Sequence, residues 1–470
     1  MRWKGLGEFL FGVHMQYVST RGSAETSSFR SVVLSGIASD GGLYVPQSLP
    51  RFASDEIASW SWLPFDSLAY HVISPFVGDE IDSSTLKAIL KDCYSQFDHR
   101  AVAPLQQIGQ NEWLLQLHHG PTQASKDFAA QLQSRLVEHL LTPSEKAILI
   151  GATNGDTGLA AIEAFKDQPN VRVVALYPRD GVPADRLASL MGSISEQVQL
   201  IGVDGSFDDC QTLVSRVLRN WPVRDVVPIS FNSTNWIGVL AQIVFFFHSA
   251  LQLGGSVRPL GFSIPGASFA EIYACFIAQK MGLPINQVIV STNTNDALHR
   301  FINQNSYSTR ELSHSLSPSM DFSLFSNLER FIWELYDHDG AFVQHLMGAF
   351  EDSGKLSIGN KQWLQARMLF DSYAVDDEQV KEELLSIFRE TGTAVDPQTA
   401  TGSLAARLYR RSMGSPMVTL AQLAPSKSSR LLAALKIWNG DVPVTMESSV
   451  NSALLSKGDI DGLSLLLHGV

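Results

Sequence analysis

The sequence predicts an α/β fold with two doubly wound layers, each built around a mostly parallel sheet. Between residues 146 and 230, short apolar runs alternate with amphipathic helical segments, the pattern of buried parallel strands joined by crossover helices. Near residue 260, a second apolar run leads through a Pro-Gly turn into a long apolar helix, so the same unit recurs. The 470 residues are enough for both layers and a further domain.

The first layer is predicted to contain four strands in βαβ order. Each strand is an apolar run, and the segments between them carry apolar residues at helical spacing. Right-handed crossovers would place these helices against the sheet. The predicted strands are 147–150, 171–177, 198–203 and 226–229, and the predicted helices are 159–165, 183–191 and 208–218.

The second layer is predicted from strands at residues 260–264 and 288–290, with the apolar helix between them. Upstream, residues 113–117 form another short strand. A Gly-Pro turn separates this strand from a helix whose apolar residues recur every fourth position over residues 128–140. The tail at residues 442–470 is interrupted by serine, glycine and aspartate and receives no assignment.

The composition favours an ordinary globular protein. Hydrophobic residues make up 45% of the chain and charged residues 17%, which is too apolar for a disordered scaffold. The 47 acidic against 35 basic residues give a net charge of -12. This charge has the wrong sign for a general binder of nucleic-acid phosphates, so nucleic acid is not an expected partner.

Neither a membrane span nor a disulfide is expected. The longest apolar stretch, residues 239–253, contains Gln242 and His248 and is shorter than the roughly 20 residues that cross a bilayer, so a buried helix is predicted. The three cysteines lack metal-ligand or redox spacing, which favours a reducing, cytoplasmic setting. The stretch before Met15 lacks the apolar core and cleavage site of a signal peptide, and the sequence does not decide between Met1 and Met15 as the start.

Lys126 is the first candidate for chemistry. It follows the Gly-Pro turn at residues 120–121 and opens the amphipathic helix, whose buried stripe would hold its backbone in place. A partly desolvated lysine can attack a carbonyl and form a Schiff base, as pyridoxal phosphate enzymes require. The alternative is an exposed lysine in the first turn of a surface helix. The preceding His118 and His119 have no paired ligands at useful spacing, so no metal is predicted.

Two turns between a strand and a helix could bind anions. The turn 151–158 follows a predicted buried strand, so its backbone N–H groups would face the crevice at the carboxyl end of that strand. The alternative is a helix cap in which Asp156 or Thr157 satisfies the amides of the helix that begins near Gly158. The turn 265–270 occupies the equivalent place in the second layer. Two anion sites beside one lysine would suit a phosphorylated aldehyde cofactor and an amino-acid carboxylate.

Eight motifs occur in one order along the chain. They lie at residues 15–22, 36–46, 119–127, 152–158, 204–209, 232–236, 292–296 and 317–330. Together they resemble the threonine synthase family, pyridoxal phosphate enzymes of fold type II. The resemblance implies a two-lobed fold like that of the tryptophan synthase β subunit, with an extra N-terminal domain. It implies an N-terminal domain at 15–110, a small α/β domain at 146–229, and a large cofactor-binding domain formed by 111–145 and 230–440.

The resemblance also assigns roles by position. It places the Schiff-base lysine, which would also carry protons during catalysis, at Lys126. The phosphate of the cofactor, pyridoxal 5'-phosphate, would be cradled by Gly266, Ala267, Ser268 and Phe269. Gln422 falls where a hydroxyl often faces the pyridine nitrogen. The substrate would be bound by Thr153, Asn154, Gly155, Asp156, Thr157, Asn232 and Asn235.

The sequence departs from the family pattern where the chemistry is expected. The departures remove two histidines, one arginine and one hydroxyl from motif positions. They fall at Ser125, Asn154, Gly238, Ala267, Ala270, Gln398, Gln422 and Ala424. Because the scaffold motifs remain readable, the pattern indicates a remodelled pocket.

Three functions remain open at this point. The first is a pyridoxal-phosphate-dependent threonine synthase, a carbon–oxygen lyase that converts O-phospho-L-homoserine and water to L-threonine and phosphate. The second is a related lyase that acts on another γ-substituted amino acid or adds another nucleophile. The third is a binding or regulatory relative without turnover, against which the retention of Lys126 argues.

Two further expectations concern one cysteine and a pair of aspartates. Cys275 lies inside the apolar helix after the second turn and is predicted to be a small buried filler. Asp208 and Asp209 are predicted to cap the helix that follows them, with a hydrogen bond across the domain cleft as the alternative.

Overall fold

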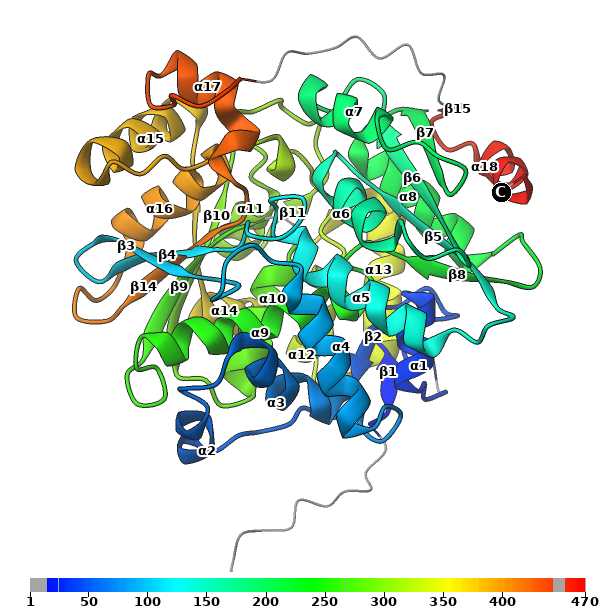
Figure 1. The fold of residues 1–470 in the computed structure, drawn as a ribbon, viewed down its shortest axis with the longest axis horizontal. Coiled ribbons are helices and arrows are strands. Elements are labelled where there is room, and N and C mark those ends of the chain that lie inside the picture. The colour runs from blue at the N-terminus through cyan, green and yellow to red at the C-terminus, as the bar shows by residue number, and fades with distance from the viewer. Residues whose placement is uncertain (1–14, 24, 267, 443–452, 470) are drawn as a thin grey trace, which may run out of the picture.

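Two sheets lie side by side and frame the molecule (Figure 1). The computed structural model describes residues 15–23, 25–266, 268–442 and 453–469. Most neighbouring strands in both sheets are parallel and are connected by helices. This arrangement confirms the predicted α/β class with mostly parallel sheets.

The five-stranded sheet has the order β15-β7-β6-β5-β8, and all its strands are parallel. Both faces are covered: along β5, Leu149 enters one apolar cluster, whereas Ile148 and Ile150 enter another on the opposite face. The four predicted strands are thereby confirmed. They are β5 (Lys146–Ala152), β6 (Val171–Pro178), β7 (Val198–Asp204) and β8 (Val226–Ser230), joined by α6 (Asp156–Phe165), α7 (Ala184–Met191) and α8 (Phe207–Arg219).

The fifth strand of this sheet differs from the prediction of four. β15 (Ala453–Ser456) comes from the tail that the sequence left unassigned, and it pairs with β7 at the sheet edge. α18 (Ile460–His468) then packs Leu463 and Leu467 against α8. These elements were missed because they are short and because only Leu455 of the strand is buried, which leaves little apolar pattern to read.

The six-stranded sheet has the order β13-β10-β9-β14-β4-β3, in which only the β3–β4 hairpin is antiparallel. The predicted strands at 113–117, 260–264 and 288–290 are confirmed as β4, β9 and β10. The strands are β3 (Leu105–Gly109), β4 (Glu112–Gln116), β9 (Leu260–Pro265), β10 (Ile285–Thr292), β13 (Phe370–Ala374) and β14 (Met417–Ala421). The helices are α9 (Ile237–Gln252), α10 (Ala270–Lys280), α11 (Ala297–Gln304), α14 (Asn360–Leu369), α15 (Asp377–Thr391), α16 (Pro397–Tyr409) and α17 (Ser429–Ala434).

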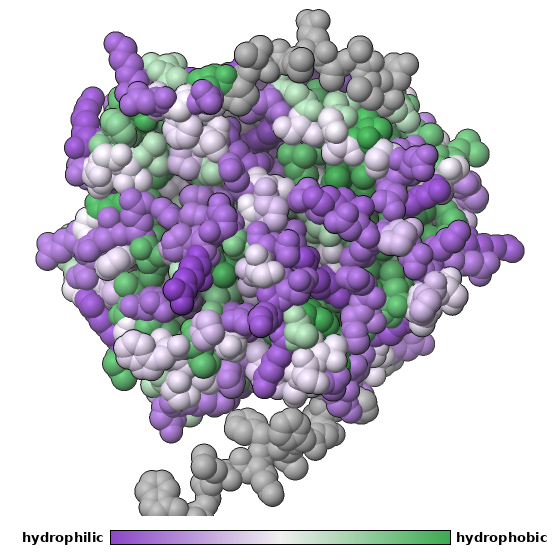
Figure 2. Space-filling model, viewed as in Figure 1, coloured by the Kyte–Doolittle hydropathy of each residue, from purple (hydrophilic) through white to green (hydrophobic). Residues whose placement is uncertain are grey.

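Two helices, α5 (Lys126–Leu140) and α9, lie where the two sheets meet. α5 packs against α6 on one side and α9 on the other. Every residue of α9 except Gln252 is buried, as expected for the apolar stretch at residues 239–253. None of the helices within the described residues is long and apolar enough to cross a membrane. On the face shown in Figure 2, hydrophobic residues are scattered among hydrophilic ones.

The N-terminal elements pack against these two helices, at the lower edge of the view in Figure 1. There α3 (Phe65–Val77) contacts α9, and α4 (Ser83–Ser95) contacts α5. A second group of helices, α12 (Leu328–Leu335) and α13 (Gly340–Ser353), lies between α11 and α14 in the chain. The N-terminal elements are β1 (Tyr17–Ser19), α1 (Phe29–Ser35), β2 (Tyr44–Pro46), α2 (Ser54–Ser59), α3 (Phe65–Val77) and α4 (Ser83–Ser95). The others are β11 (Tyr307–Ser308), α12 (Leu328–Leu335), α13 (Gly340–Ser353) and β12 (Lys355–Leu356).

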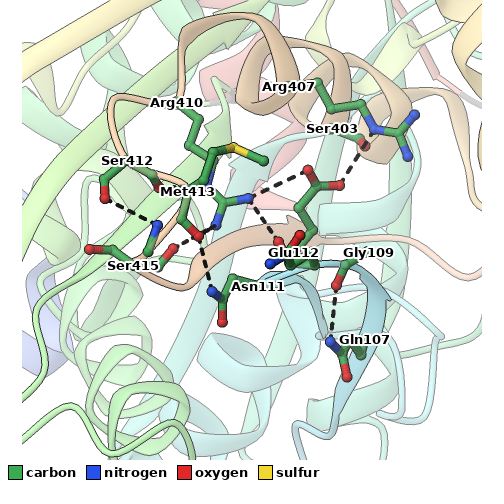
Figure 3. Close-up of polar contacts among 12 residues, drawn as sticks. Gln107, Gly109, Asn111, Glu112, Ser403, Arg407, Arg410, Ser412, Met413 and Ser415 are labelled. Atoms are coloured by element: carbon green, nitrogen blue, oxygen red, sulfur yellow. Dashed lines mark hydrogen bonds and ion pairs between the residues drawn. The ribbon is translucent and has the colours of Figure 1, made fainter.

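An arginine fixes the start of β14 beside the β3–β4 hairpin (Figure 3). The side chain of Arg410 is 2% exposed, and it donates to the carbonyl oxygens of Gln110 at 3.1 Å and Ser415 at 2.7 Å. It also faces the carboxylate of Glu112 at 3.5 Å. Because β14 runs directly into Gln422, this anchor at the start of the strand helps to define the wall of the pocket at its end.

Candidate active site

A pocket lies at the carboxyl ends of β5 and β8 in one sheet and of β9 and β14 in the other. Several of the residues predicted at the site line this pocket, and others lie outside its lining. Those that line it are Lys126, Asn154, Asp156, Thr157, Asn232, Ser268 and Gln422. Those outside its lining are Thr153, Gly155, Asn235, Gly266 and Phe269, and Ala267 lies outside the described residues.

Lys126 is the first residue of α5, and the turn before it is tightly held. The carboxylate of Asp127 accepts hydrogen bonds from the backbone N–H of Thr122 at 2.9 Å and from its hydroxyl at 2.8 Å. Burial raises the pKa of Asp127 to about 6, although these hydrogen bonds oppose the shift. The N–H of Ser125 donates to the carbonyl of Gln422 at 2.7 Å. The backbone that carries Lys126 is therefore fixed to β14.

Three polar side chains meet beside the pocket. Lys126 Nζ donates to Glu271 Oε1 at 2.9 Å, and Gln242 Nε2 donates to the same oxygen at 3.3 Å. Glu271 Oε2 and Gln242 Oε1 are buried and have no hydrogen-bond partner. Sequence reasoning missed Glu271 and noted Gln242 only as a polar interruption of an apolar helix. That interruption was the available signal, because a buried amide needs a partner.

A side chain of the turn after β5 binds two of that turn's backbone N–H groups. Thr153 Oγ1 accepts from the N–H groups of Gly155 at 2.9 Å and Gly158 at 2.8 Å. The alternative of a cap by Asp156 or Thr157 is wrong, because the hydroxyl of Thr153 binds these N–H groups from outside the helix. Gly155 has φ 126°, a conformation that favours glycine. Thr153 therefore holds the backbone of the turn, whereas the neighbouring Asn154 and Thr157 line the pocket.

Asp156 connects this turn to three other segments. Its carboxylate lies 3.0 Å from Arg186 NH1 and 2.7 Å from Lys427 Nζ, and it accepts from the hydroxyl of Ser319 at 3.1 Å. Burial acts to raise the pKa of Asp156, but the attraction of Arg186 and Lys427 outweighs it and holds the pKa well below its usual range. The cluster carries one negative and two positive charges at the edge of the pocket.

The turn after β9 is arranged differently. Phe269 has φ 63°, and the helix α10 that follows has no side-chain cap. The hydroxyl of Ser268 lines the pocket and is buried without a partner. The N–H of Gly266 donates to the carbonyl of Ser291 at 2.7 Å, which anchors the beginning of the turn. An uncapped helix N-terminus with a free hydroxyl is suited to an anion.

Two departures from the family pattern contact each other. The hydroxyl of Ser125 donates to Gln422 Oε1 at 3.2 Å, and Gln422 Nε2 donates to the carbonyl of Pro265 at 3.1 Å. Both ends of the Gln422 amide are therefore engaged. A third departure, Gln398, also lines the pocket, and its Nε2 is buried without a partner. Gln398 is thus the free amide donor on this wall.

The two asparagines of the motif after β8 hold backbone. Asn232 exchanges hydrogen bonds with both the N–H and the carbonyl of Ala152, each at 2.8 Å. Asn235 donates to the carbonyl of Val33 at 2.9 Å and accepts from the N–H of Ile237 at 3.1 Å. Asn232 still lines the pocket, whereas Asn235 is directed to the N-terminal helix α1.

A buried arginine behind this motif was also missed. Arg330 is fully buried and donates to the carbonyls of Ser233 at 3.0 Å and Thr234 at 2.7 Å. Its neighbour Asn327 donates to the hydroxyl of Ser233 at 3.0 Å and to the carbonyl of Ser268 at 3.4 Å. The pair holds the turn after β9 beside the motif after β8. The sequence signal for it was the presence of an arginine inside the motif at residues 317–330.

The two aspartates before α8 hold secondary structure in place. Asp209 forms a capping box with Ser206 at the start of α8, while Asp208 accepts from the N–H and the hydroxyl of Ser323, so each expectation holds for one of the two aspartates.

The histidines and cysteines form no further site in the part of the chain that the structure describes. Burial lowers the pKa of His118 to about 4. His119 hydrogen-bonds to Asp98 and Gln116. Within the described residues, no group of histidine, cysteine, aspartate and glutamate side chains is arranged to hold a metal. The cysteines Cys93, Cys210 and Cys275 are buried and free.

The site fits a phosphorylated aldehyde cofactor. The amine of Lys126 lies inside the pocket, where it could attach to an aldehyde. An uncapped helix N-terminus and the free hydroxyl of Ser268 provide for a phosphate, and Gln398 Nε2 provides a donor to a ring or substrate. These buried polar atoms need partners that the protein does not supply.

Comparisons with known proteins agree with this fit. The family described as "Pyridoxal-phosphate dependent enzyme" matches residues 99–421, which makes the chain a pyridoxal-phosphate enzyme with a two-lobed fold. The family described as "Threonine synthase N terminus" matches residues 16–94. A threonine synthase from Pseudomonas aeruginosa is 46% identical over 415 residues, covering 88% of each chain. The chain belongs to the threonine synthase family.

Solved structures show the same relationship. The pyridoxal-phosphate-bound threonine synthase of Brucella melitensis has a TM-score of 0.85 and 33% identity, covering 97% of this chain and 99% of that one. Yeast threonine synthase has a TM-score of 0.85 and 28% identity, covering 97% and 98%. These structures confirm the expected fold type II architecture with an N-terminal domain. Pyridoxal phosphate is the cofactor.

Proposed function

We propose that this threonine synthase family member converts O-phospho-L-homoserine and water to L-threonine and phosphate, with Lys126 as the attachment site of the cofactor. The observation that carries the proposal is the position of Lys126 inside the pocket, between the two strand-to-helix turns. The Pseudomonas aeruginosa relative named threonine synthase supports the substrate.

Each part of the pocket has a role in this proposal. When bound through Lys126, the pyridoxal ring supplies an electron sink for the negative charge that develops at the substrate Cα. Lys126, as a free amine, moves protons at Cα and Cβ. Ser268 and the N-terminus of α10 bind the cofactor phosphate, and Asn154, Thr157 and the N-terminus of α6 bind the substrate carboxylate.

The pocket also positions the cofactor ring and limits water. Gln422 is fixed by its bonds to Ser125 and Pro265, so it forms a rigid wall where the ring nitrogen is expected. Phe207, Phe231 and Phe322 contribute apolar surface to the lining. A partly apolar lining excludes bulk water and protects the negative charge at Cα from early protonation.

Borohydride reduction of the cofactor-loaded protein, followed by peptide mapping, tests the attachment site. The label should appear on Lys126. A label on another lysine, or no label, would contradict the proposal. The purified protein should then release phosphate and form threonine in equal amounts from O-phosphohomoserine, whereas phosphate release without threonine would indicate a different acceptor.

One observation favours a second candidate, a related lyase that acts on another γ-substituted amino acid. Lys126 is the sole cationic side chain that lines the pocket among the residues the structure describes, and Gly238 lies where an arginine commonly follows this motif. A phosphate group would therefore lack a strong anchor at that point. A Gly238→Arg variant, measured with O-phosphohomoserine and with an uncharged γ-ester of homoserine, distinguishes the candidates. A lower KM for the phosphate ester alone would support the second.

Three further features of the proposal concern the setting and layout of the protein. We propose a cytoplasmic location, which the three buried free cysteines support because thiols persist in a reducing compartment. The net charge of -12 supports a small molecule rather than a nucleic acid as the partner. The division into 15–110, 146–229, and 111–145 with 230–440 is proposed as the domain layout.

A further inference from the structure

We infer that Glu271 is a positioning residue for Lys126, whose carboxylate holds the lysine amine in the pocket and exchanges a proton with it. This inference deepens the proposed function, since it concerns the residue that carries the cofactor. Glu271 is the second residue of α10, immediately after the turn proposed to bind the cofactor phosphate. One helix thus carries both the phosphate cradle and the partner of the lysine.

The geometry leaves Glu271 dependent on Lys126. The carboxylate side chain is 1% exposed, and the lysine side chain is 25% exposed. Within the described residues, Lys126 is the single cation that forms an ion pair with Glu271. A buried carboxylate without a cation is strongly disfavoured, so each side chain holds the other in place. The N-terminal position in α10 favours the negative charge of Glu271 as well.

Gln242 orients the carboxylate. Its Nε2 and Lys126 Nζ both donate to Oε1 of Glu271, so the two donors fix that oxygen toward the pocket. Oε2 is buried and has no partner. Gln242 comes from α9, where the residues four positions away on either side, Gly238 and Phe246, carry no polar side chain.

The proton exchange is a simple transfer along the existing hydrogen bond. Lys126 as an ammonium group gives one proton to Glu271 Oε1, which leaves a neutral amine and a neutral carboxylic acid. The reverse step restores the ion pair. A lysine must be a neutral amine to act as a nucleophile or base, and it must be an ammonium group after it has taken a proton from the substrate. A carboxylate at 2.9 Å serves both states.

Labelling of Lys126 in the full-length chain freed of cofactor tests the inference without using the catalytic reaction. Acetic anhydride acylates neutral amines, and peptide mass spectrometry reports the rate at Lys126 relative to the exposed Lys361. In Glu271→Gln the ammonium form loses its counter-charge. Because the ion pair at 2.9 Å engages the lysine amine, its loss should let Lys126 be labelled about tenfold faster near neutral pH.

A matched control is Glu383→Gln. Glu383 is also buried, 4% exposed, and pairs with Arg407 at 3.3 Å, far from Lys126 in the chain and on a different helix. This variant should leave the labelling rate at Lys126 unchanged. An unchanged rate in Glu271→Gln, in a protein that melts at the temperature of the control, would overturn the inference.

A second variant and a second measurement separate positioning from a merely structural role. Glu271→Asp keeps the charge but draws it back by one methylene, so labelling should be only about threefold faster, and this variant also serves if Glu271→Gln does not fold. In the loaded enzyme, Glu271→Gln should lower kcat about 100-fold with KM within about threefold, and Glu271→Asp should restore part of the loss. A rise in KM alone would contradict the inference. Failure of threonine formation in the unmodified enzyme would instead count against the proposed function.

Discussion

The two strand-to-helix turns of the pocket occupy equivalent places in their sheets but treat their backbone amides in opposite ways. After β5, Thr153 binds the N–H groups of Gly155 and Gly158, and Asp156 is neutralised by neighbouring cations. After β9, α10 has no side-chain cap and Ser268 has no partner. Two N–H groups of the first turn are thus bound within the protein, whereas the second turn leaves a buried hydroxyl without a partner. The difference supports the proposal that the second turn holds the permanent anion, the cofactor phosphate.

The largest effect is expected at Lys126, which lies between the turns. Lys126→Ala should reduce threonine formation by at least about a thousandfold, because both covalent attachment and proton transfer at Cα are lost. If the turn after β9 is a complete phosphate cradle, the variant should still bind pyridoxal phosphate reversibly. Absorbance before and after dialysis measures this, and a variant that takes up no cofactor at all would weaken the assignment of that turn.

A negative charge placed in each turn sharpens the comparison. Ser268→Asp should weaken cofactor affinity about 100-fold, because its carboxylate would repel a phosphate in the cradle. Asn154→Asp should leave cofactor affinity unchanged and raise the KM of the amino-acid substrate about tenfold, because it faces the substrate carboxylate in the proposal. Fluorescence titration with the cofactor and steady-state kinetics separate the two. If both variants lost cofactor affinity equally, the two turns could not be assigned separately to the cofactor phosphate and the substrate.

The ion cluster of the first turn predicts a pH-dependent loss of stability. Asp156→Asn should lower the free energy of unfolding by about 3 kcal/mol at neutral pH, because Arg186 and Lys427 lose a buried counter-charge. Since the pKa of Asp156 is lowered in the folded state, its contribution is present above the usual aspartate pKa and is lost as the pH falls through the lowered value. Urea unfolding between about pH 7 and pH 3 should therefore show the gap narrowing at the acid end.

The control for this variant lies on the same helix. Glu163 pairs with Lys166 on the surface of α6, with side chains 38% and 53% exposed. Glu163→Gln should change stability by less than about 1 kcal/mol at any pH, because water screens an exposed pair. A loss as large as that of Asp156→Asn would mean that burial of the cluster does not decide its strength.

The smallest effect is expected at the cap of the first turn. Thr153→Val removes the hydroxyl that binds two backbone N–H groups, so the free energy of unfolding should fall by about 1 to 2 kcal/mol while cofactor affinity is retained. Thr157→Val, four residues on in the same turn and helix, should change stability by less than about 0.5 kcal/mol. Urea unfolding of the two variants side by side measures the difference. Equal stability in both would show that Thr153 is not the cap.

The sequence predicted the layers and the lysine because their signals are local. Apolar runs and helical stripes identified seven strands and six helices of the two layers, and the motifs placed Lys126 at its turn. Glu271 and Arg330 escaped because their importance arises from contacts between distant segments, such as the 145 positions between Lys126 and Glu271. The role of Thr153 escaped for a geometric reason: its hydroxyl caps a helix that begins after a positive-φ glycine, outside the usual cap position.

The placement of β15 has a consequence for how the chain reaches its folded form. Strands β5 to β8 leave the ribosome long before β15, which, among the residues that the structure describes, covers the outer edge of β7. Until it arrives, β7 presents a row of unpaired backbone groups that could recruit a strand from another molecule. The strand β15 therefore completes the edge of the sheet. A nascent or C-terminally shortened chain, which lacks this strand, is expected to be prone to aggregation.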